Sequence, residues 1–130
     1  MNSTKKIRVA QIIGRTINGG VENLIYNYYQ NIDRTKIQYD FFVEEPSDII
    51  NVEKIEKMGG RVVIIPSYKK IFKYTKVLKK MFIEGKYDIV QANMNSLSVF
   101  SLRAAKKAKI KVRICNSLSI QTRKRNFTIC

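Results

Sequence analysis

The sequence predicts an α/β fold, a single Rossmann-like domain with a parallel sheet and helices on both faces. Three observations support this prediction. Short apolar runs alternate with amphipathic segments along the chain, which is the order expected of βαβ units. The length of 130 residues is that of one domain. A hydrophobic content of 45% is typical of a globular protein and argues against disorder.

The first half of the chain is expected to supply three strands and two helices. An apolar run at 7–14 ends in glycine and predicts a buried strand. The segment 21–29 predicts a helix, since its apolar residues fall on one stripe. A strand at 37–43 precedes a helix that Ser47 or Asp48 could cap and that Gly59 and Gly60 would stop after Met58. The third predicted strand is the run 61–66.

The second half repeats the alternation. A helix is predicted at 70–84 because Ile71, Tyr74, Leu78, Met81 and Phe82 share one side. The remaining predicted elements are a strand at 87–92, a helix from Val99 to Ala108 that Ser96 or Ser98 opens, and a strand at 111–115. We expect residues 1–120 to form the domain, and residues 121–130 to be an irregular basic tail without strand or helix.

The composition excludes several kinds of chemistry. The chain contains no histidine, so it has no Ser-His-Asp or Cys-His relay and no Cys/His zinc site, and we expect no metal. Its two cysteines suit a reducing compartment. No apolar run reaches the roughly 18 residues of a membrane span. We therefore expect a cytoplasmic protein. Peripheral association with the inner face of the membrane is compatible with this location.

The basic residues are concentrated in the second half of the chain. The net charge is +15, and residues 66–130 hold 16 basic and 2 acidic side chains. Such asymmetry predicts an anionic partner: nucleic acid, anionic lipid or a phosphorylated substrate. No helix-turn-helix, RNP-like or zinc-finger pattern is present, and we therefore do not expect nucleic acid as the partner.

A lysine-rich helix is the most basic predicted element. Lysines line the side of helix 70–84 and its flank that faces away from the apolar stripe: Lys69, Lys73, Lys76 and Lys80, with Lys70 and Lys79 beside them. This pattern suits a peripheral helix on an anionic membrane surface. For a helix inside a βαβ unit, the pattern is more typical of a helix that packs on the sheet and leaves its lysines in solvent. The two interpretations are compatible.

Polar and glycine-rich segments follow three of the predicted strands. The loop that includes Gly14, Gly19 and Gly20 leads into a helix, where backbone N–H groups favour an anion; it could also be a plain turn. The clusters 91–96 and 116–119 are rich in Asn and Ser. They could bind sugar hydroxyls at the carboxyl edge of the sheet, or serve as helix caps and turns.

Three segments together carry a family resemblance. The strand 7–14 with Asn18-Gly19-Gly20-Val21-Glu22, the stretch 87–96 and the stretch 112–119 resemble glycosyltransferase family 4 (group 1). The likeness is to the N-terminal, acceptor-side domain of bacterial exopolysaccharide and capsule enzymes. It implies half of a GT-B fold and a retaining, metal-independent hexosyl transfer without cofactor. The donor would be a nucleotide-sugar and the acceptor a lipid-linked sugar or polysaccharide.

The resemblance also implies the site residues. Gly19 and Gly20 would lie near the donor phosphates, and Asn116 stands where the family has a catalytic histidine. The remaining substrate-binding positions would be Asn93, Asn95, Ser117 and Ser119. The family also has histidines at the positions of Gln91 and Asn93. Asparagine forms hydrogen bonds but cannot become a cation near neutral pH.

The resemblance covers one of the two GT-B domains. We expect the C-terminal, donor-binding domain to be missing, which would leave a truncated form that is inactive alone and needs a separate C-terminal domain as partner. The alternative is a non-catalytic basic module that binds an anionic membrane or a partner protein.

Overall fold

A computed structural model describes residues 5–14, 20–45, 52–94, 97–116 and 127–129. Strands and helices alternate along the chain up to the fifth strand. In order, the elements are β1 (Ile7–Gly14), α1 (Gly20–Asn31), β2 (Ile37–Glu44), α2 (Val52–Lys57), β3 (Arg61–Ile65), α3 (Ile71–Gly85), β4 (Ile89–Ala92), α4 (Ser98–Lys107), β5 (Val112–Asn116) and β6 (Phe127–Ile129).

The strands form one sheet in the order β3-β2-β1-β4-β5-β6. The first five are mutually parallel, whereas β6 runs antiparallel to β5. Because β1 pairs with β2 on one side and β4 on the other, the chain crosses over β2 and β1 between β3 and β4. The Rossmann-like α/β fold is confirmed, and the strand order changes direction between β1 and β4.

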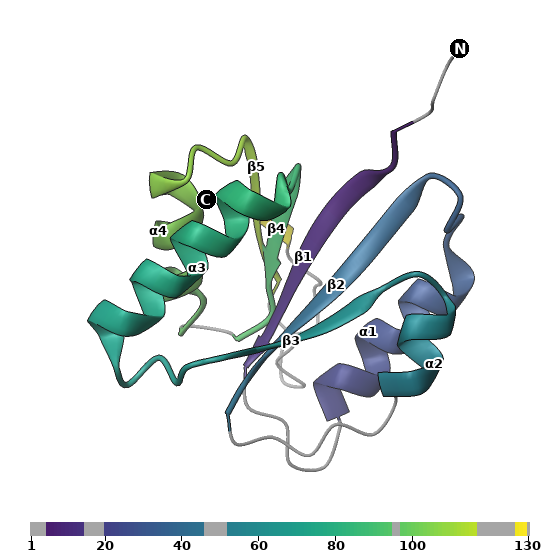
Figure 1. Cartoon of the computed structure of the whole chain (residues 1–130), viewed down its shortest axis with the longest axis horizontal. Helices are drawn as coiled ribbons and strands as arrows, with labels where there is room; N and C mark the ends of the chain where they lie inside the picture. Colours follow the sequence, from purple (N-terminus) through teal and green to yellow (C-terminus); the bar gives the residue numbers. More distant parts are fainter. Residues whose placement is uncertain (1–4, 15–19, 46–51, 95–96, 117–126, 130) are drawn as a thin grey trace.

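Helices cover both faces of the sheet, as Figure 1 shows. Ile25 and Tyr29 of α1 and Ile55 of α2 pack in one cluster of buried residues with Phe41 of β2. Tyr74, Leu78 and Phe82 of α3 pack in the second cluster, on the opposite face, together with residues of α4. These three α3 residues belong to the stripe that the sequence predicts for this helix. Two apolar layers therefore enclose the strands.

Some element boundaries differ from the prediction. The second helix begins at Val52, and the predicted caps Ser47 and Asp48 lie outside the described residues. The helix ends at the glycines, as predicted: Gly59 has a φ of 94°, and the N–H of Gly60 donates to the carbonyl of Ile55 at 3.0 Å. The fourth strand begins at Ile89 instead of residue 87.

The end of the chain departs from the expected irregular tail. Residues Phe127–Ile129 form β6, which pairs with residues 114–116 of β5. The prediction was therefore wrong for these three residues. A strand without a second neighbour exposes a row of unpaired backbone groups, and β6 covers that row on β5. Residues 121–126 and 130 lie outside the described residues.

One buried carboxylate, that of Asp40, is held within the sheet by four side chains. Asp40 is 0% exposed, and its Oδ2 accepts from Arg8 at 3.1 Å, from Arg61 of β3 at 3.4 Å and from Tyr87. Its Oδ1 accepts from Gln38 at 2.9 Å. Burial raises the pKa of the Tyr87 hydroxyl, and the hydrogen bond to Asp40 and the charge of Asp40 raise it further. This cluster links β1, β2 and the turn before β4.

Candidate functional site

The carboxyl edge of the sheet carries two linked asparagines. Asn93 follows β4 directly and Asn116 ends β5, and the pairing of Ala92 with Cys115 places them side by side. The Nδ2 of Asn116 donates to the Oδ1 of Asn93 at 3.1 Å. Asn93 is 3% exposed and Asn116 is 2% exposed. Two positions that the sequence analysis places in the site are thus in direct contact, and both are buried.

A third amide extends this contact to β1. The Nδ2 of Asn93 donates to the Oε1 of Gln11 at 3.1 Å and lies 3.2 Å from the carbonyl oxygen of Ile12. The Nε2 of Gln11 lies 3.4 Å from the Oε1 of Gln91. We call Gln11, Asn93 and Asn116 the amide chain. It joins β1, β4 and β5 next to the point where the strand order changes direction.

Sequence reasoning missed Gln11. The residue is 1% exposed, and it is the polar residue in the middle of an otherwise apolar stretch of β1, Val9 to Ile13. A buried polar side chain is expected to have a hydrogen-bond partner. This expectation could have pointed to Gln11 as a residue of the site, although the sequence does not show that its partner lies 82 positions away.

Gly14 brings the end of β1 close to the amide chain. Gly14 ends β1 with a φ of 84°, and a Cβ there would lie 3.1 Å from the Cε of Met94. Glycine therefore permits the end of β1 to approach the residue after Asn93. Gly20 is the first residue of α1. The other predicted residues of this edge lie outside the described residues: Gly19, Asn95, Ser117 and Ser119.

The chemistry available at this edge is hydrogen bonding by neutral amides. Each carboxamide can donate and accept, but none carries a charge near neutral pH. The Nδ2 of Asn93 lies within hydrogen-bonding distance of Gln11 and of two backbone carbonyls. Its donor capacity is therefore used within the protein. The amide chain fixes the relative position of three strand ends.

Glu44 is a further polar residue at the carboxyl edge that sequence reasoning missed. It ends β2, it is buried, and its Oε1 accepts from the backbone N–H of Tyr68 at 3.1 Å. Burial raises the pKa of the Glu44 carboxyl, and the hydrogen bonds from Tyr68 and Ser67 partly oppose this effect. Glu44 holds the segment that leads into α3. An acidic residue at the end of an apolar strand was the signal in the sequence.

The four predicted anion-binding lysines are all exposed on or just before α3: Lys69, Lys73, Lys76 and Lys80. The opposite side of the helix is buried against the sheet at Tyr74, Leu78 and Phe82. This arrangement fits both interpretations of the helix, a solvated face and an anion-binding face.

The described part of the chain contains neither a metal-binding cluster nor a membrane-spanning helix. Among residues with assigned positions, no group of three or more His, Cys, Asp or Glu side chains is arranged to hold a metal ion. The helices of this part are also too short or too polar to cross a bilayer.

Comparison with known proteins adds one relative. No protein-family model matches the chain. Over 120 residues the chain is 30% identical to the curated protein named "Putative glycosyltransferase EpsF" of Bacillus subtilis (strain 168). The match covers 90% of this chain and 31% of the relative, so the chain spans about a third of that protein's length. The similarity supports the resemblance to a glycosyltransferase that the sequence motifs indicate.

Proposed function

We propose that the chain is the N-terminal, acceptor-side domain of a family 4 glycosyltransferase with the GT-B fold. The whole enzyme would transfer a sugar from a nucleotide-sugar to a lipid-linked or polysaccharide acceptor, with retention of configuration, in exopolysaccharide or capsule synthesis. One observation carries the proposal: the linked Asn93 and Asn116 lie at the carboxyl edge of a parallel sheet, in a chain similar to a protein named as a glycosyltransferase.

The place of the amide chain supports this assignment. In open α/β sheets, ligands bind outside the carboxyl ends of the strands where the strand order changes direction. Here that point lies between β1 and β4, and Gln11 and Asn93 join these two strands. We assign Gly19 and Gly20 to the donor phosphates, because free N–H groups at a helix N-terminus attract anions.

The buried amides suggest how the site would work. We assign to Asn116 a positioning role, since its carboxamide is bonded to Asn93 and its exposure is 2%. Direct contacts with sugar hydroxyls would come from Asn95, Ser117 and Ser119. A site of neutral amides and hydroxyls orients a substrate through hydrogen bonds, and positioning can supply a large part of a rate enhancement.

We expect the isolated 130 residues to be inactive. One wall of a cleft leaves a bound nucleotide-sugar in contact with water and poorly oriented, so positioning and exclusion of water are both lost. Activity would require a second domain that holds the donor. We expect no metal to be needed, since in the resembled enzymes the donor is held without one.

The test combines this chain with the part of the Bacillus relative that the match does not cover. Release of nucleotide is measured over a panel of UDP-, GDP- and ADP-sugars, with each partner alone as control. The proposal predicts turnover by the assembled pair and none by the separate parts. A correctly folded pair that neither binds nor turns over any nucleotide-sugar contradicts it.

A second arm examines the position of the family histidine. Asn116→His is compared in the assembled pair with Asn31→His, which changes an exposed asparagine of α1. We expect Asn116→His to alter the rate and its pH dependence, because an imidazole can change its charge near neutral pH. The Asn31→His variant should behave as the unchanged chain.

A further inference from the structure

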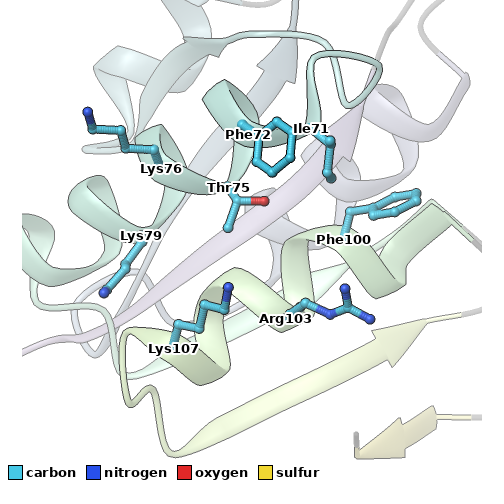
Figure 2. A pocket seen from close by; sticks show the side chains of 8 residues that line it. All are labelled: Ile71, Phe72, Thr75, Lys76, Lys79, Phe100, Arg103 and Lys107. Carbon is cyan, nitrogen blue, oxygen red and sulfur yellow. The ribbon is translucent and has the colours of Figure 1, made fainter.

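A groove of about 400 Å³ runs between α3 and α4. Figure 2 shows the two helices side by side, with the lining side chains coming from both of them. Four of these side chains are positively charged: Lys76, Lys79, Arg103 and Lys107. Two are aromatic, Phe72 and Phe100. Of the lysines that the sequence analysis places on the outer side of helix 70–84, Lys76 and its neighbour Lys79 line the groove.

The four cations of the groove have no acidic partners among the described residues. The ion pairs of this part of the chain involve Arg8, Lys36 and Arg61 instead. Helix α4 contains no acidic residue, and the acidic residue of α3 is Glu84, near the end of the helix. Four like charges on two adjacent helices repel one another, so an anion in the groove would relieve that repulsion.

An exposed aromatic ring lies on the same stripe as two of these cations. Phe72 is 89% exposed, and the intervals of four and seven residues place it in line with Lys76 and Lys79 on the surface of α3. Phe100 of α4 is half-buried and stacks on Tyr68, with ring centroids 5.8 Å apart. The groove therefore combines an exposed apolar side chain with four positively charged ones.

We propose that this groove docks the chain on an anionic phospholipid membrane. Phe72 would enter the boundary between head groups and acyl chains, and the four cations would contact lipid phosphates. An aromatic side chain beside a cluster of cations is the pattern of interfacial membrane binding. A free phosphate would gain nothing from Phe72, which makes a lipid surface the ligand that uses both parts of the groove.

The groove has a defined relation to the proposed site. Both α3 and α4 begin just after strands that end at the carboxyl edge, β3 and β4. Docking through these helices would hold that edge near the membrane, where a lipid-linked acceptor would lie; this consequence rests on the proposed function. Membrane binding itself does not, because it can be measured without donor, acceptor or second domain.

The absence of tryptophan from the chain makes insertion measurable. Phe72→Trp introduces a single fluorophore, and Tyr28→Trp places one at another exposed aromatic position, on α1. The full chain is mixed with vesicles of phosphatidylglycerol and phosphatidylcholine in equal parts, or of phosphatidylcholine alone. We expect a blue shift for Phe72→Trp with the anionic vesicles only, and no shift for Tyr28→Trp.

A matched pair of charge reversals tests the cations. The groove pair combines Lys76→Glu with Lys107→Glu. The control pair, Lys54→Glu with Lys57→Glu, changes the net charge equally but lies on α2. Each groove lysine should contribute about fivefold to vesicle affinity, so the groove pair should lose roughly 25-fold or more while added salt weakens the unchanged chain.

Three results would overturn the proposal. The first is failure of the unchanged chain to bind anionic vesicles. The second is an equal loss of vesicle binding in the groove pair and the α2 pair. The third is binding of an anionic polymer such as heparin or single-stranded RNA without binding of vesicles. None of these results bears on nucleotide release by the assembled pair, so the two proposals fail separately.

Discussion

Asn116 donates its side-chain amide to Asn93 at 3.1 Å, and this contact joins the ends of two adjacent parallel strands. The same Asn93 donates to Gln11 of β1 at 3.1 Å. Buried amides held by one another cannot be changed singly without leaving a polar group unpaired. The contact is therefore important for stability as well as for the proposed site.

Asn93→Ala should lower the free energy of unfolding by about 1–3 kcal/mol, because buried polar groups of Gln11 and Asn116 lose a partner. Asn116→Ala should cost less, since it removes the end of the amide chain. Urea unfolding of both variants and of the double variant measures their coupling. The double variant should cost less than the sum of the two single changes; strict additivity would show that the contact does not contribute.

Asp40→Ala should destabilise the protein by about 3 kcal/mol, since it leaves Arg8 and Tyr87 without the buried carboxylate. Asp40→Asn keeps the shape and one acceptor, and should cost less. Thermal or urea unfolding gives both values. Glu56→Ala, at an exposed position of α2, is the control and should stay within about 0.5 kcal/mol.

Two lysines occupy backbone conformations that favour glycine. Lys86 follows α3 with a φ of 52°, and Lys109 follows α4 with a φ of 63°. Lys86→Gly and Lys109→Gly should each raise stability by up to about 1 kcal/mol, because glycine adopts positive φ without the steric cost of a Cβ. Lys80→Gly, inside α3, should instead lower stability by about 1 kcal/mol. Urea unfolding checks the three signs.

Glu44 should make stability depend on pH in a defined direction. Burial raises its pKa above the ordinary 4.5 in the folded protein. The folded state therefore holds the proton more tightly, and this contribution to stability is present below pH 4.5 and lost as the pH rises through the folded pKa. Glu44→Gln should therefore become more stable, relative to the unchanged chain, as the pH rises from 4.5 through the folded pKa of Glu44.

The measurement for Glu44 is urea unfolding at a series of pH values that begins below its ordinary pKa. Glu45→Gln, at the exposed neighbouring position, is the matched control for the loss of one carboxyl. A difference between Glu44→Gln and the unchanged chain that does not vary with pH would show that Glu44 does not titrate differently in the folded protein.

The sequence was sufficient to predict the sheet and its helices, because apolar runs and helical stripes are local patterns. It also placed Asn93 and Asn116 at the same edge, since parallel strands end together. Gln11 and β6 were missed for a physical reason: both depend on partners far along the chain. The sequence predicted the lysines of helix 70–84 but not the groove, because Arg103 and Lys107 join it from α4 through packing against α3.

The most direct test of the central claim, that this carboxyl edge is one wall of a sugar-transfer site, is the rate of nucleotide release by the assembled pair. The rate is compared for the unchanged chain, Asn116→Ala and the exposed control Asn31→Ala, at a temperature where all three are folded. We expect a loss of at least about tenfold for Asn116→Ala and none for the control, since displaced substrates react slowly. Equal rates in all three assemblies would contradict it.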